Sequence, residues 1–251
     1  MTKTRSAAWV LALAVLLGVG FRVHAIAFKK AITHDEGISY LAATGHQKEY
    51  SLLPYDHRYP FGLWVPASEW KPFITRDRLF CFHKIGWDLA HYDIHPPLYF
   101  WLLHVWIWIF NVHLWTGPLL NVVITLLMII ALYRFASTML GNQFEASVVT
   151  FIWAVNPYVL EETLEARAYG LLALFALLVV WRTILYTERD GKPTLKELAI
   201  LAILTTGGAL THYHFALAVA GCGLYALVRL FRRQRQRFFA FVGAMASGYV
   251  P

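Results

Sequence analysis

The feature that most constrains this chain is its first long apolar run. Residues Ala7 to Phe28 follow the basic residues Lys3 and Arg5 and are almost entirely apolar. A helix needs about 20 mostly apolar residues to cross a bilayer, and a basic leader favours the cytoplasmic side. We therefore predict a first transmembrane span here. A cleavable signal peptide ending near Val23–Ala25 is the alternative, although Arg22 and the later apolar runs argue against it.

The composition also indicates a membrane protein. The 251 residues are 58% hydrophobic and only 15% charged, against about 25% charged in ordinary soluble domains. Ten Trp residues fit a protein that meets the membrane–water interface. The net charge of +7 is explained by basic cytoplasmic loops without invoking nucleic acid. Cys81 and Cys222 lie in unlike surroundings and predict neither a disulfide framework nor a thiolate metal site.

Further apolar runs follow a polar segment that has no stretch long enough to cross a bilayer. They cover residues 95–110, 114–135, 147–160, 168–186, 195–210, 215–230 and 238–251. We expect an all-α fold: a polytopic transmembrane helical bundle with a long first extracytoplasmic loop bearing interfacial helices. The chain is predicted to be one module (1–251), with a first span at 7–28, an outer catalytic loop at 29–94 and the remaining spans at 95–251. Because the last run stops at Val250–Pro251 in mid-helix, we expect the chain to be cut short at its C-terminus.

The basic residues predict how the runs thread through the membrane. The arginine-rich segment 229–237 and, less strongly, residues 189–196 should be cytoplasmic. Working back from these segments places residues 211–214 and 161–169 outside and Arg134 inside. The polar clusters outside would then share one face of the membrane.

Between the long outer loop and Arg134, this threading allows only one crossing of the membrane, but the sequence has two apolar runs there. Residues 95–110 are too few to span comfortably, so we prefer an interpretation in which they lie in the interface or enter and leave on the same side. The alternative is that residues 114–135 and their neighbour form a hairpin and that one later basic loop breaks the charge rule.

The segment ITHDEGISYLAATG, residues 32–45, places the acids Asp35 and Glu36 side by side. Thr33 and Glu36 have the spacing of a capping box, and Gly45 suits a helix end, so an interfacial amphipathic helix is predicted. This interpretation explains Glu36 as a cap. It gives Asp35 only about 0.3–1 kcal/mol from the helix dipole and leaves that residue available for chemistry.

Three more polar clusters fall on the same predicted outer face. They are Asp93–His95, Glu165–Arg167–Tyr169 and His212–His214. The planar donor fork of Arg167 suits a phosphate. His212 and His214 could donate hydrogen bonds to phosphate oxygens as well.

Each of these clusters also has a purely structural interpretation. The sequence His95–Pro97 is a stiff helix start. Glu165 and Arg167 could form a local ion pair at a helix end, with Glu165 and Tyr169 on one helical face. The two histidines of the last cluster could simply lie in the interface. A zinc site is disfavoured because the spacing of its candidate ligands matches no compact motif; those candidates are His34, His91 and His95.

Taken in order, several motifs match a known pattern: a basic leader and one span, the acid pair Asp35–Glu36, the stretch His95-Pro96-Pro97-Leu98-Tyr99, the motif Arg167-x-Tyr169, and Thr211-His212-Tyr213. Together they resemble the GT-C glycosyltransferases. The resemblance is strongest to the family 39 type, which includes protein O-mannosyltransferases and lipid A aminoarabinose transferases. It covers nearly the whole chain.

The resemblance implies a membrane enzyme that moves a sugar from a polyprenyl-phosphate carrier to a hydroxyl or lipid acceptor on the extracytoplasmic face. It implies that Asp35 and Glu36 form the catalytic element, with Asp35 as general base. Arg167, His212 and His214 would lie near the donor phosphate. The remaining candidates would shape the site: His34, Asp93, His95 and Tyr169.

The resemblance leaves the cofactor open. The outer loops contain no obvious Asp-x-Asp ligand pair, so no metal ligand is assigned and a divalent metal is not required by the sequence. We expect an integral, multi-pass protein of a bacterial plasma membrane with its active face outward. Its partners would be the lipid-linked donor, a lipid, glycan or protein acceptor, and membrane lipids, with no nucleic acid. The alternatives are a lipid or small-solute transporter, whose polar groups should lie near the membrane midplane, and a truncated non-catalytic membrane protein.

Overall fold

The computed structural model describes residues 3–55, 64 and 66–249. Within these ranges the chain forms helices and no strand, so the predicted all-α fold is confirmed. The end of the last apolar run, Val250–Pro251, lies outside the described residues.

The described residues form twelve α-helices. They are α1 (Lys3–Ala27), α2 (His34–Thr44), α3 (Gln47–Ser51), α4 (Phe82–Tyr92), α5 (Leu98–Phe110), α6 (Thr116–Leu140), α7 (Gln143–Ala154), α8 (Pro157–Glu162), α9 (Tyr169–Glu188), α10 (Leu195–Ala209), α11 (Phe215–Leu230) and α12 (Arg235–Ser247), with short 3-10 helices at Leu53–Tyr55, Ala67–Glu69 and Lys71–Ile74. Three helices in the described part are long and apolar enough to cross a membrane: α1 over Arg5–Ala27, α6 and α9. The chain is therefore a helical membrane bundle.

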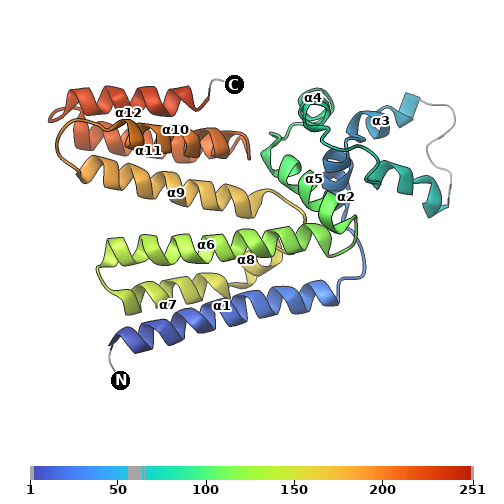
Figure 1. Ribbon diagram of the computed structural model, residues 1–251, viewed down its shortest axis with the longest axis horizontal. Coiled ribbons are helices and arrows are strands. Elements are labelled where there is room, and N and C mark those ends of the chain that lie inside the picture. The colour runs from blue at the N-terminus through green and yellow to red at the C-terminus, as the bar shows by residue number, and fades with distance from the viewer. Residues whose placement is uncertain (1–2, 56–63, 65, 250–251) are drawn as a thin grey trace.

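The long helices run side by side in two groups (Figure 1). α1 packs against α6 and α7, while α9 packs against α10 and α11, and α12 covers α10 and α11. The contact between α6 and α9 joins the two groups. At one end of the bundle lie α2 to α5 and the connections 163–168 and 211–214; we call it the site end. The opposite end, called the basic end, carries the connections 189–194 and 231–234.

The short apolar helix α5 does not run along the bundle. It has 13 residues, which at 1.5 Å per residue gives a length of about 20 Å, less than the roughly 30 Å of a hydrocarbon core. It lies at the site end, where it packs against α2 and α6 (Figure 1). This position agrees with the interpretation that residues 95–110 enter and leave on the same side.

The run predicted as one span at 147–160 is broken into two helices. α7 ends at Ala154 and α8 starts at Pro157. The side chain of Asn156 accepts hydrogen bonds from the N–H groups of Tyr158 and Val159 and so caps the new helix. Because Asn-Pro favours a helix start and Pro interrupts a continuing helix, the break follows from the sequence, although the apolar composition hides it.

Candidate active site

Helix α2 begins as its sequence predicts. The Thr33 hydroxyl accepts a hydrogen bond from the Glu36 N–H at 3.3 Å, and Glu36 Oε2 accepts one from the Thr33 N–H at 3.1 Å. Gly45 ends the helix in the left-handed conformation, at φ 76°. Residues 39–44 are all buried, so α2 is packed more deeply than an amphipathic interfacial helix would be.

The fully buried Glu36 carboxylate joins three separate parts of the chain. Its Oε2 lies 2.9 Å from Lys29 Nζ, and its Oε1 accepts a hydrogen bond from the Ala166 N–H at 3.0 Å. Lys29 also donates to the Leu164 carbonyl at 3.0 Å. A buried charge is tolerated only when it is paired and hydrogen-bonded in this way. Both Glu36 oxygens are thus occupied in holding the 163–168 connection against α2.

Asp35 faces a different environment. Its side chain is 53% exposed, and its Oδ2 lies 3.5 Å from Nη2 of Arg167. Arg167 Nη1 also lies 3.5 Å from the Asp35 carbonyl oxygen. The exposed His34 ring lies 3.3 Å from Asp35 Oδ1. Long contacts of an exposed carboxylate contribute little to stability, so Asp35 is accessible to a ligand at this end of the bundle.

Asn121 of α6 holds the connection that carries Arg167. Its fully buried amide Nδ2 donates to the Glu165 carbonyl and, at 3.4 Å, to the Arg167 carbonyl, while the Tyr99 hydroxyl donates to its Oδ1 at 3.2 Å. The predicted helical arrangement of Glu165 and Tyr169 is wrong, because α9 begins only at Tyr169. The backbone groups of this connection are hydrogen-bonded to the side chains of Asn121 and Glu36 instead of to one another within a helix.

The rings of His95 and His212 lie next to each other and line the same cavity as Arg167. His95 Nδ1 lies 2.7 Å from Asp93 Oδ1, and the ring centroids of His95 and His212 are 6.0 Å apart. The His212 ring is in turn 5.8 Å from the ring of Tyr169, over which the Arg167 guanidinium lies at 5.6 Å. A backbone hydrogen bond of 2.8 Å from the start of α5 to the end of α10 fixes these elements relative to each other.

A narrow cavity of about 10 Å³ lies between these groups. It is lined by Ser39, His95, Phe100, Arg167, Ala168, Tyr169 and His212. Its wall therefore offers a guanidinium, two imidazoles and two hydroxyls, which are suitable partners for an anion such as phosphate. His214 stacks on His212 with centroids 4.7 Å apart but does not line the cavity. Asp35 adjoins the cavity through its contact with Arg167.

The surroundings of the cavity shift the pKa of two groups, Asp93 and His212. Burial opposes ionisation of Asp93, but hydrogen bonds from His95 and the Ile94 N–H, with the charges of His95 and Arg167, outweigh it and lower the pKa of the carboxyl. Burial, followed by the positive charges of His214, His95 and Arg167, lowers the pKa of His212. His212 Nδ1 accepts from the His214 N–H at 3.1 Å, so a neutral ring carries its proton on Nε2.

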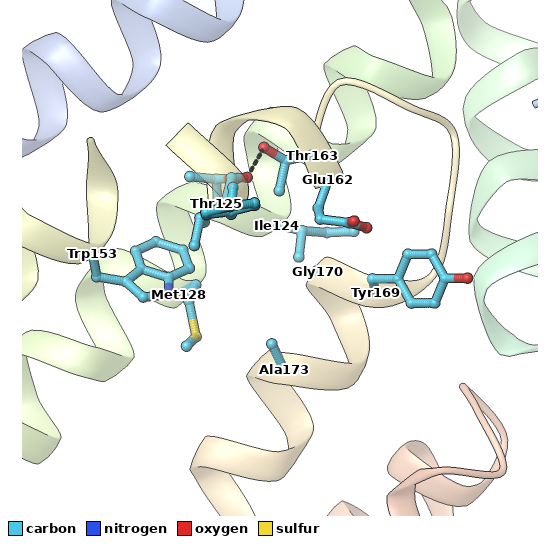
Figure 2. A pocket seen from close by; sticks show the side chains of 11 residues that line it. Ile124, Thr125, Met128, Trp153, Glu162, Thr163, Tyr169, Gly170 and Ala173 are labelled. Carbon is cyan, nitrogen blue, oxygen red and sulfur yellow. Dashed lines mark hydrogen bonds between the residues drawn. The ribbon is translucent and has the colours of Figure 1, made fainter. Parts of the chain in front are cut away.

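A larger, mostly apolar cavity of about 240 Å³ adjoins the first. It lies among α6, α7, α8 and α9, and Tyr169 lines both cavities. Figure 2 shows Trp153 and Met128 on one side of this cavity and Tyr169 on the other, with its ring pointing away from them. An apolar space that borders a polar, cationic one is suited to an amphipathic ligand with an anionic head.

Three residues that contribute to the site are missing from the sequence predictions: Lys29, Ser39 and Asn121. Lys29 directly follows the first span, and Asn121 is an amide inside an apolar run, a position at which polar residues are costly and usually functional. These signals were present in the sequence, whereas nothing local marks Ser39. In the described part of the chain, no group of three or more His, Cys, Asp or Glu side chains is arranged to hold a metal ion.

Comparison with known proteins identifies the family. A family model described as dolichyl-phosphate-mannose-protein mannosyltransferase matches residues 94–249, which include Arg167 and both histidines of the 211–214 connection but not Asp35 or Glu36. No curated protein and no solved structure matches the chain. Since the match covers more than half of the chain, the protein belongs to the dolichyl-phosphate-mannose-protein mannosyltransferase family of the GT-C superfamily and is a membrane glycosyltransferase.

Proposed function

We propose that this protein transfers a sugar from a polyprenyl-phosphate donor to an acceptor on the extracytoplasmic face, with Asp35 as general base. One observation carries the proposal: Arg167 contacts Asp35 at 3.5 Å and also lines the polar cavity together with His95 and His212. The arrangement puts a carboxylate and a cation side by side, as the displacement of a phosphate requires.

The proposed reaction needs two kinds of help from the protein. A bond forms between the acceptor oxygen and the sugar C1, while the bond between C1 and the phosphate oxygen breaks. Asp35 takes the proton of the acceptor hydroxyl. Arg167 and the Nε2–H of His212 stabilise the charge on the departing lipid phosphate, with His214 supporting the His212 ring. A phosphate that engages Arg167 would also release Asp35 from its weak ion pair.

We assign a positioning role to Glu36 and site-shaping roles to His34, Asp93, His95 and Tyr169. Both Glu36 oxygens are engaged, so Glu36 supports its neighbour instead of accepting a proton. Asp93 fixes the His95 ring by a contact of 2.7 Å. Tyr169 borders both cavities, and His34 lies at the exposed side of Asp35.

The apolar cavity supports a lipid-linked donor. A carrier whose phosphate sits beside Arg167 could extend its apolar chain past Tyr169 toward Met128 and Trp153 (Figure 2). The outward orientation is supported by charge, since Arg229, Arg232 and Arg233 gather at the opposite end and basic segments favour the cytoplasm. The polar groups of the site gather at one end of the bundle, not near its middle, which favours transfer over transport.

A transfer assay tests the proposal. Membranes carrying the full chain are supplied with radiolabelled polyprenyl-phosphate sugars, mannose first because the family description names it, and release of the sugar from the carrier is measured. Asp35→Asn should lower transfer by about 10²- to 10⁴-fold, the usual contribution of a general base. Glu69→Gln removes another exposed acid of the same segment and should leave transfer unchanged. Equal transfer by Asp35→Asn and the wild type would overturn the assignment.

The phosphate role of Arg167 is tested separately. Arg167→Lys keeps the charge but loses the planar fork, so the apparent affinity for the donor should fall at least several-fold while the protein stays folded. An unchanged donor affinity would exclude Arg167 as the phosphate ligand.

A further inference from the structure

A polar cavity of about 560 Å³ lies at the basic end, between the last turn of α9 and the end of α11. It is remote from the site end and is not used by the proposed reaction (Figure 1). Its polar lining consists of three arginines, two acids, one amide and one hydroxyl: Arg229, Arg232, Arg233, Glu188, Asp190, Gln234 and Thr187. The cavity thus carries charges of both signs.

The hydrogen-bonding capacity of this lining is largely unused. Among the described residues, none of the three arginines forms an ion pair, although two acids line the same cavity. Gln234 Nε2 donates to Asp190 Oδ1 at 2.9 Å, which fixes the orientation of the amide. Gln234 Oε1 is buried and has no hydrogen-bond partner among the described residues. The arginines therefore offer guanidinium donors to an anionic ligand.

The cavity is continuous with an apolar face of α11. Leu217, Leu224 and Val228 are 74%, 64% and 75% exposed, and their spacing places them on one side of the helix. Val228 also lines the cavity. From Leu217 to Val228 the helix rises about 16 Å, which is comparable to a large part of an acyl chain. A molecule with its head in the cavity and an apolar chain along this face would be in contact with the protein over its whole length.

We propose that this cavity binds a bilayer phospholipid whose headgroup carries both a phosphate and a primary ammonium, that is, a phosphoethanolamine headgroup. The phosphate pairs with the arginines, which suit it by charge and by donor geometry. The ammonium donates to Asp190 and to Glu188. A choline headgroup has no N–H to donate, and a glycerol headgroup has no positive charge to offset the two acids, so both fit less well.

Lipid retention by the purified full chain tests the proposal. The protein in detergent is mixed with phosphatidylethanolamine, phosphatidylcholine or phosphatidylglycerol of the same acyl chains, and bound lipid is counted by native mass spectrometry. The wild type should retain phosphatidylethanolamine about tenfold better than the other two, the effect expected from a few charge-assisted hydrogen bonds. The double variant Arg232→Gln/Arg233→Gln should lose this retention. Arg235→Gln removes a charge from the first turn of α12, next to the connection but outside the cavity, and should bind as the wild type does.

A second variant keeps the proposal testable if the arginine variant folds poorly. Glu188→Gln/Asp190→Asn leaves the phosphate partners in place, so it should bind phosphatidylcholine and phosphatidylethanolamine equally. Equal retention of the two lipids by the wild type would overturn the proposal, as would an equal loss in Arg235→Gln and the double arginine variant. Displacement of the lipid by an equal concentration of soluble phosphoethanolamine would assign the cavity to a soluble ligand instead.

Discussion

The carboxylate of Glu36 accepts a hydrogen bond of 3.0 Å from the backbone N–H of Ala166, which lies 130 residues further along the chain. Its other oxygen pairs with Lys29, and Lys29 also binds the Leu164 carbonyl. The connection that carries Arg167 is thereby tied to the first turn of the helix that carries Asp35. The base and the phosphate ligand of the proposed reaction are positioned by one buried ion pair.

Glu36→Gln should therefore destabilise the protein much more than Asp35→Asn. Removing the Glu36 charge leaves Lys29, whose side chain is only 14% exposed, without its carboxylate partner, a loss of up to about 3–5 kcal/mol, whereas an exposed pair such as Asp35–Arg167 contributes about 0–1 kcal/mol. Thermal unfolding of the detergent-purified variants, followed by Trp fluorescence, measures the difference. Equal shifts in Tm for the two variants would show that Glu36 does not support the site.

Local patterns in the sequence predict much of this fold. The capping box of Thr33 and Glu36 and the helix end at Gly45 depend on residues a few positions apart, and both form as expected. The threading of the runs likewise follows from length and charge. In the predicted arrangement, residues 161–169 and 211–214 share one end and the arginine-rich segments the other, as Figure 1 shows.

The partners of the site residues could not be predicted in the same way. Glu36 meets Ala166, and Asn121 meets the carbonyls of Glu165 and Arg167, across distances in sequence that no local pattern encodes. The local pattern predicts a helix from Glu165 onward, but these long-range hydrogen bonds hold residues 165–168 in a non-helical connection. The convergence of the polar clusters on one face was predictable from topology, but which side chain is buried and which is free was not.

The pH dependence of stability should reflect His212 and His46. Burial lowers the pKa of both below 6.5; nearby positive charges add to the effect at His212, while Asp77 opposes it at His46. The unfolded chain then binds more protons than the native one below about pH 6.5, so these groups favour the native state above that pH and less as the pH falls. We expect Tm to fall between pH 7 and pH 5.

Substitution of the two histidines checks this origin. His212→Gln and His46→Gln should each make the fall in Tm between pH 7 and pH 5 less steep, and the double variant should flatten it further, because the two residues lie in different connections. The slope is compared, not Tm itself, since each substitution also removes hydrogen bonds. An unaltered slope in both single variants would contradict the prediction.

The fully buried Arg22 of α1 should be needed for the break between α7 and α8. It donates to the carbonyls of Gly18, Ala154 and Val159 at 2.7, 3.1 and 3.3 Å and to the Thr163 hydroxyl at 2.7 Å. Arg22→Lys cannot reach all of these acceptors. Each buried carbonyl left without a partner costs about 1–3 kcal/mol.

We therefore expect Arg22→Lys to lower Tm clearly, although the charge is kept, and Arg22→Met to lower it further. Arg134→Lys makes the same exchange at an exposed position of α6 and should leave Tm within a degree or two, as surface substitutions usually do. If Arg22→Lys behaved like Arg134→Lys, the hydrogen bonds of the guanidinium would not be needed.

Gly117→Ala should disrupt the site by a steric clash with Ala166. Alanine ordinarily favours a helix over glycine by about 0.5–1 kcal/mol, and Gly117 lies in the first turn of α6. A Cβ at this position would, however, overlap the Cβ of buried Ala166 and lie 3.1 Å from both its Cα and the Tyr40 hydroxyl. Such overpacking costs about 1–3 kcal/mol, more than the helical gain, so the net effect is destabilising.

The connection has no easy way to move aside, because Ala166 donates to Glu36 while Asn121 holds the carbonyls on either side of it. Gly117→Ala should thus lower both Tm and sugar transfer. Gly86→Ala in α4 is the matched control: its Cβ would make only an ordinary contact of 3.6 Å with Trp101. Full transfer by Gly117→Ala would show that Arg167 does not depend on the close approach of α6, whereas a loss confined to Gly117→Ala would tie activity to the position of Ala166.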